Sequence, residues 1–105
     1  MGELYASGTF GQIVPGVYWF ETPTTADSSD TVSITLGSWG MKRFLHMMEN
    51  IHSTAESVVV QPGANWTTFP PGSNSTTAVS SGVLTITIGS GTNTKHTFVV
   101  VGAGN

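Results

Sequence analysis

Few side chains in this chain of 105 residues could carry acid–base chemistry. They are six acids and three histidines: Glu3, Glu21, Asp27, Asp30, Glu49, Glu56, His46, His52 and His96. Catalysis by such groups requires a positioned pair with tuned pKa values. Glu49 and Glu56 would face one another across a hairpin, and Asp27 and Asp30 lie in a Ser-rich segment where turn formation explains them. We therefore expect solvated acids and predict that the protein is not an enzyme.

A metal centre is not expected either. On a strand, His46 and His52 would lie on one face about 20 Å apart, whereas zinc needs three or four converging ligands at about 2.0–2.3 Å. The three histidines are interpreted as surface or interface residues, whose protonation at mildly acidic pH would weaken assembly. The chain has no cysteine, which removes thiolate ligands, disulfides and thiol nucleophiles together. No cofactor is predicted.

Low charge is the most unusual feature of the composition. Charged residues make up 9% of the sequence, against about 25% in an average protein. The net charge is −3, and Lys42, Arg43 and Lys95 are the only fixed cations, so no basic stripe could neutralise phosphates and direct binding of nucleic acid is not expected. No run of 18 apolar residues occurs, and no membrane span is predicted. The neutral surface suits a protein packed against others, or a secreted or viral β domain with a Ser/Thr coat.

Two segments, 31–36 and 83–88, alternate apolar and polar residues and are predicted to be half-buried strands. Their sequences resemble each other, and each is followed by a glycine. We expect each to end in a glycine turn that returns the chain as a hairpin.

Further strands are predicted from residue type. Segment 96–101 favours a strand, and its valines at 99–101 break the alternation, which indicates that both faces are covered there. Pro15-Gly16 is predicted to form the turn between strands at 13–14 and 17–20. A polar loop follows at 21–30.

The segment 41–52 is ambiguous. Its apolar residues fit a helical stripe, but it lies between a glycine turn and a valine-rich strand expected at 58–60, in a chain that is otherwise β. We favour a long strand, because an isolated helix would need two changes of structural class within about 20 residues. A long proline-rich loop is predicted at 61–81, where Trp66 and Phe69 either fix the loop or project into a partner.

Together these segments predict an all-β fold, a single antiparallel β-sandwich or small barrel of six to seven strands. The length fits one domain over 1–105, with 1–10 as a candidate N-terminal arm. Trp19 and Trp39 lie near strands and are expected in the core.

The order of the segments resembles that of small structural proteins of tailed bacteriophages. The residues that carry the resemblance are Thr31–Gly37, Ile51–Thr54, Ser57–Val60, Gly82–Gly89 and Thr97–Gly102. Within that group, small cysteine-free β-rich proteins resemble capsid decoration or cement proteins, which bind as trimers at three-fold positions and brace the shell against internal pressure. The resemblance implies a virion protein that forms a homo-oligomer, a trimer, and binds the major capsid protein or other virion proteins.

The same resemblance suggests that the arm at 1–10 adds a strand to a capsid edge. The predicted partner-binding residues are Leu4, Tyr5, Phe10, Trp66 and Phe69. The alternative is a carbohydrate- or receptor-binding β module of a phage tail or fibre, in which Trp66, Phe69 or Tyr18 stack on sugar rings.

Overall fold

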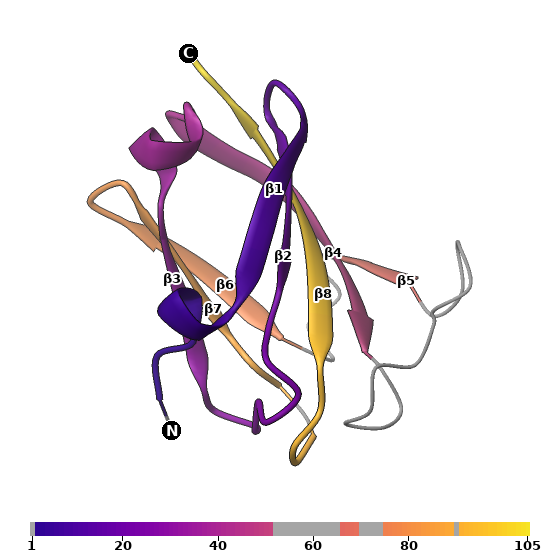
Figure 1. The fold of residues 1–105 in the computed structure, drawn as a ribbon. Coiled ribbons are helices and arrows are strands. Elements are labelled where there is room, and N and C mark those ends of the chain that lie inside the picture. Colours follow the sequence, from indigo (N-terminus) through magenta and orange to yellow (C-terminus); the bar gives the residue numbers. More distant parts are fainter. Residues whose placement is uncertain (1, 52–65, 70–74, 90) are drawn as a thin grey trace.

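Two antiparallel sheets form a β-sandwich in the computed structural model, which describes residues 2–51, 66–69, 75–89 and 91–105 (Figure 1). The larger sheet contains, in spatial order, β1 (Thr9–Val14), β2 (Val17–Glu21), β8 (His96–Ala103), β4 (Arg43–Ile51) and the short β5 (Trp66–Phe69). The smaller sheet contains β3 (Thr31–Thr35), β7 (Val83–Thr87) and β6 (Thr76–Ser80). Seven strands form the facing layers and β5 extends the larger sheet beyond β4, so the predicted fold class is confirmed.

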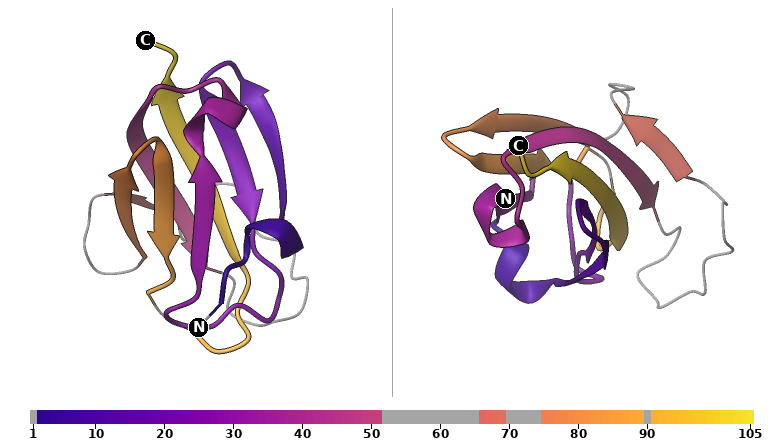
Figure 2. Two further views of the ribbon diagram at one scale, coloured as in Figure 1. Left: turned by 90° about the vertical axis from the view of Figure 1, so that its left-hand side faces the viewer. Right: turned by 90° about the horizontal axis from the view of Figure 1, so that it is seen from above.

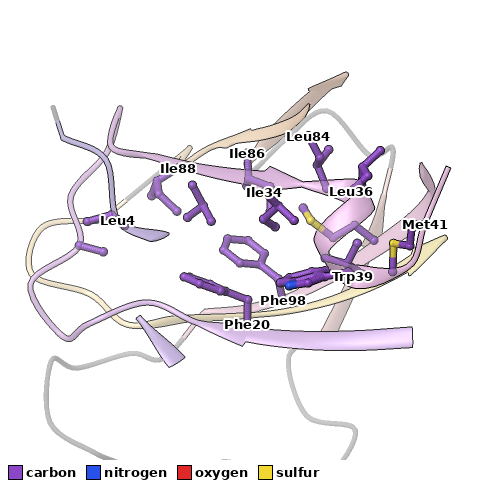
Figure 3. Packing of buried hydrophobic residues seen from close by; sticks show 14 residues of the cluster. Leu4, Phe20, Ile34, Leu36, Trp39, Met41, Leu84, Ile86, Ile88 and Phe98 are labelled. Carbon is purple, nitrogen blue, oxygen red and sulfur yellow. The ribbon is translucent and has the colours of Figure 1, made fainter. Parts of the chain in front are cut away.

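The core lies between the two sheets because alternate residues of each strand point inward. Ile34 of β3 and its neighbours on β7, Leu84 and Ile86, face Phe20 and Phe98 of the larger sheet (Figure 3). All of these side chains have no exposed surface. Burying one such side chain stabilises the fold by roughly 1.5–3 kcal/mol relative to leaving it in water.

The two segments that resemble each other in sequence are partners in the structure. Ile34 of β3 lies opposite Leu84 of β7, in an antiparallel register. The hairpins expected directly after these strands are wrong: each strand is followed by a buried residue, Leu36 or Ile88, and the chain crosses to the other sheet. The first crossing is a short 3-10 helix, η2 (Leu36–Trp39).

Tight hairpins form instead at two other places. Pro15-Gly16 joins β1 to β2, as predicted. Ser81 and Gly82 join β6 to β7, and both have positive φ angles, 52° and 77°. This is the geometry of a type I′ turn, whose twist matches that of paired strands.

The ambiguous segment 41–52 is confirmed as a strand over Arg43–Ile51, and 22–30 is a loop. The loop predicted at 61–81 is wrong in part, because it includes β5 and β6. Strand β6 has almost no apolar alternation, and its pairing with β7 decides its structure. The strand expected at 58–60 lies outside the described residues.

The candidate arm packs against the chain's own sandwich in this structure (Figure 1). Leu4 N–H donates to Thr31 O at 2.7 Å, and Thr31 N–H donates to Gly2 O at 2.7 Å, so residues 2–4 run along the outer edge of β3. A 3-10 turn, η1 (Tyr5–Ser7), then leads into β1. Within the described ranges, no helix is long and apolar enough to cross a membrane.

Candidate functional site

Two of the predicted partner-binding residues, Tyr5 and Phe10, belong to a cluster of aromatic rings. Tyr5 of η1 stacks on Phe10 of β1, with ring centroids 5.5 Å apart, and on Phe20 of β2 at 5.6 Å. Trp39 of η2 packs against Phe10 at 5.6 Å and stacks on Tyr18 at 4.5 Å, with an interplanar angle of 4°. We call these five residues the aromatic cluster.

The aromatic cluster runs from the core to the surface. Trp39 is only 3% exposed, as expected for a core residue, and within the described part of the chain its Nε1 atom has no hydrogen-bond partner. Phe10 is 45% exposed, although its ring rests on both Tyr5 and Trp39. The cluster therefore presents one aromatic ring to solvent on a rigid base of other rings.

Other exposed apolar residues lie at one end of the larger sheet. Ile13 and Val14 end β1, and Leu45 lies at an irregularity in the pairing of β4 with β8. The two regions flank the end of β8, where Gly102 N–H donates to Gly16 O at 2.8 Å. This end of the sheet thus exposes a second group of apolar residues, separate from the ring of Phe10.

The remaining predicted partner-binding residues lie elsewhere. Leu4 is 8% exposed and belongs to the chain's own core, so it is not available to a partner in this structure. Trp66 and Phe69 were expected in a loop but are the ends of β5, where they lie opposite Asn50 and Met47 of β4. Their side chains lie outside the described part of the chain, and their role stays a prediction.

A buried polar cluster closes the other end of the sandwich. The Nδ1 atom of His96 lies 2.6 Å from Oε2 of Glu49, and neither side chain has any exposed surface. Ser75, just before β6, donates from Oγ to the same carboxylate at 2.7 Å and from its N–H at 3.3 Å. The expectations of a solvated Glu49 and a surface His96 are therefore wrong.

Alternation along the strands explains why these two polar residues are inside. Glu49 is two residues after Met47, and His96 is two residues before Phe98, and both apolar residues point into the core. A period of two then directs Glu49 and His96 inward as well. The alternation is visible in the sequence, but the general tendency of charged side chains to be solvated outweighed it in the prediction.

Hydrogen bonds from the polar cluster reach several strands. Gly89 N–H, after β7, donates to Ser75 Oγ at 3.3 Å, and His96 N–H donates to Thr22 Oγ1 at 2.9 Å. The carboxylate of Glu49 thereby connects β4 of the larger sheet to the entry of β6 in the smaller one. The cluster can therefore help to hold the two sheets together.

The polar cluster does not have the geometry of a nucleophilic relay. In such a relay the serine bonds to the imidazole, whereas Ser75 bonds to the carboxylate and the Nε2 atom of His96 has no hydrogen-bond partner among the residues that the structure describes. Because Glu49 and His96 are fully buried, a dissolved substrate does not reach them here. Among the described residues, no three His, Asp or Glu side chains converge on a point.

Two further carboxylates fasten the N-terminal segment. Asp30 accepts hydrogen bonds from Asp27 N–H at 2.9 Å and Gly2 N–H at 2.7 Å, which hold its pKa below the ordinary value. Partial burial raises the pKa of Glu3, but hydrogen bonds from Ser33, Tyr5 and Thr31 outweigh that effect and leave it lowered. Both acids therefore favour the charged form, in which they bind the backbone.

Comparisons of the chain with protein-family models, with curated proteins and with solved structures found no match.

Proposed function

We propose that this chain is a structural protein of a tailed-bacteriophage virion, a capsid decoration protein that binds the major capsid protein and stabilises the shell. The family resemblance of its strand and turn pattern suggests this role. The structural observation that supports it is the exposed Phe10 on the aromatic cluster. Three further exposed apolar residues, Ile13, Val14 and Leu45, lie at one end of the same sheet.

The physical argument concerns the cost of ordering a side chain on binding. An interface residue loses about 0.5–1.5 kcal/mol when a flexible side chain becomes immobile. The ring of Phe10 is already restrained by Tyr5 and Trp39 in the folded protein. Binding would therefore remove little further conformational freedom from this side chain. Aromatic residues held in this way are frequent among the residues that dominate binding energy.

The low charge of the chain supports the same role. A decoration protein occupies many equivalent positions on a shell, so its copies approach one another closely. With charged residues at 9% and a net charge of −3, repulsion between copies is weak. The proposed assembly on the shell is a trimer, as the resemblance implies.

The test uses phage shells from which the protein is missing. Wild-type protein should co-sediment with these shells and raise the temperature at which they disassemble, and Phe10→Ala should bind at least about tenfold more weakly. Thr9→Ala, at the exposed neighbouring position of the same strand, is the control and should bind normally. Absence of binding by the wild-type protein, or equal binding by both variants, would contradict the proposal.

The sugar-binding alternative has weaker support from the described residues. Sugar rings stack on a free aromatic face, and one face of Tyr18 is covered by Trp39 at 4.5 Å. The other two residues named for this role, Trp66 and Phe69, have no described side chains. Saturable glycan binding that Tyr18→Ala removes would favour this alternative over the decoration role.

A further inference from the structure

The edge strands of the two sheets are protected to different degrees. An edge strand exposes unpaired N–H and C=O groups that can pair with another chain, and proteins block such edges with charges, bulges or covering segments. The edge of β3 is covered, since residues 2–4 bond to Thr31 and Glu3 accepts the N–H of Ser33 at 2.8 Å. The edge of β1 is irregular, because its register shifts between Gln12 and Val14.

Strand β6 has none of these protections. Its residues, Thr76, Thr77, Ala78, Val79 and Ser80, include no charge and no proline, and all five pair with β7 in an unbroken register. It lies at the outer side of the smaller sheet, with β7 between it and β3 (Figure 2, left). No described segment pairs with its outer edge.

The hairpin geometry identifies the free backbone groups. In a two-residue hairpin the residues that flank the turn, Ser80 and Val83, exchange hydrogen bonds, and bonded pairs then alternate along the ladder. Ala78 therefore bonds to β7, whereas the N–H and C=O groups of Thr77 and Val79 point away from it. Ser75 fits the same alternation, because its outward N–H is the one that bonds to Glu49.

Side-chain exposure agrees with an accessible edge. Val79 lies opposite the buried Leu84 and so shares the core-facing side of the sheet. The Val79 side chain is nevertheless 48% exposed, as expected for a residue on a strand at the open side of the sandwich. Thr76, Ala78 and Ser80 are exposed on the opposite face.

We propose that β6 is a self-association edge, where two copies of this chain pair antiparallel about a two-fold axis at Ala78. In this register Thr77 of each copy lies opposite Val79 of the second copy, and all the free groups of both residues are satisfied. The two Ala78 residues then meet as a non-hydrogen-bonded pair, where Cα atoms approach to about 4.5 Å. A small side chain is suited to this closest approach.

The absence of charge identifies a second copy as the occupant. A two-fold axis places each residue near its own equivalent, so a charged residue at the centre of the edge would meet a like charge, which is destabilising. The edge of β6 carries no such residue, and the pairs it would form are hydroxyl with hydroxyl and Thr with Val. This inference does not depend on the proposed virion role.

Introducing a charge of either sign at Ala78 tests the position of the two-fold axis directly. Sedimentation velocity from micromolar to millimolar concentration should show the mass of the wild-type particle doubling. Ala78→Lys and Ala78→Glu should each prevent the doubling, because like charges face each other, and an equimolar mixture of the two variants should restore it. Ala78 is exposed, so both variants should keep the wild-type circular dichroism spectrum and unfolding temperature.

Proline substitution tests the backbone hydrogen bonds. Val79→Pro removes an outward N–H and no bond to β7, a position that proline tolerates in an edge strand, and should weaken the association by about tenfold to a hundredfold. Val79→Thr keeps the N–H and is the matched control, which should associate like the wild type. A wild-type mass that stays constant up to millimolar concentration overturns the proposal, as does doubling that persists in Val79→Pro or in the single-charge variants.

Discussion

His96 and Glu49 form a fully buried pair, with Nδ1 of the imidazole 2.6 Å from Oε2 of the carboxylate. They lie on neighbouring strands, β8 and β4, among buried residues that are mostly apolar. Burying two polar groups costs desolvation free energy that only good geometry and further hydrogen bonds repay. Here Ser75 provides the further bonds and extends the pair to the smaller sheet.

Replacing one member of this pair should destabilise the fold strongly. His96→Leu leaves the Glu49 carboxylate buried with Ser75 as its remaining partner, and we expect a loss of about 3–5 kcal/mol in the free energy of unfolding. The double variant Glu49→Met with His96→Leu should be more stable than His96→Leu alone, since it leaves no buried carboxylate, but less stable than the wild type, because the two Ser75 donors lose their acceptor. Guanidinium unfolding of the single and double variants gives the coupling energy, and a double variant as unstable as the sum of the singles would contradict the expectation.

Asp30 should make the stability of the fold depend on pH. Its pKa is lowered from an ordinary value of 3.8 because Asp27 N–H and Gly2 N–H donate to the charged form. A lowered folded-state pKa contributes stability that is fully present above the unfolded-state value and is lost as the pH falls through the folded-state value. The wild-type free energy of unfolding should therefore decline from about pH 5 downward.

Asp30→Asn is the variant that isolates this contribution. It should be less stable than the wild type at pH 7, and the difference between the two proteins should shrink as the pH is lowered. Glu3→Gln should follow the same direction with a smaller change, because Glu3 is exposed and screened by solvent. A difference between wild type and Asp30→Asn that stays constant from neutral to acidic pH would exclude this origin.

Residue type and pattern were enough to predict most of the fold. Alternation identified β3 and β7, β-favouring residue types identified β8, and the all-β context favoured a strand over a helix for β4. Alternation did not identify β6, since Thr76–Ser80 has no apolar pattern of its own and becomes a strand through pairing with β7. The hairpins were also misplaced, because a glycine after a strand does not distinguish a return within one sheet from a crossing between two.

The candidate site was predictable only in part. Tyr5 and Phe10 were identified as contact residues from their type and position, and the structure brings their rings together. Trp39, which contacts both rings, comes from η2, an element distant from them in sequence, so spacing could not reveal the cluster. The open edge of β6 could not be predicted from the sequence either, because whether a strand lies at an edge depends on the order of the strands in the sheet.

Close backbone packing at two glycines gives a last prediction, on stability. A Cβ atom at Gly11 would lie 2.8 Å from Nε1 of Trp19, the residue opposite it on β2, and a side chain can shift to relieve such a contact. A Cβ atom at Gly102 would lie 2.6 Å from the carbonyl oxygen of Arg43, and backbone paired in a sheet cannot shift easily. We expect Gly11→Ala to cost about 1 kcal/mol and Gly102→Ala about 3 kcal/mol or more.

Thermal unfolding of both variants tests whether Gly102→Ala is more destabilising than Gly11→Ala. Tryptophan fluorescence reports whether the indole of Trp19 has moved in Gly11→Ala. Gly40→Ala provides a control of a different kind, because its surroundings are open and its φ angle of 70° is the only source of strain. It should therefore cost roughly 1–2 kcal/mol, the penalty of a left-handed conformation at a residue with a Cβ atom. If Gly102→Ala were less destabilising than Gly40→Ala, the close approach of β8 to β4 at Arg43 would not be a constraint on the fold.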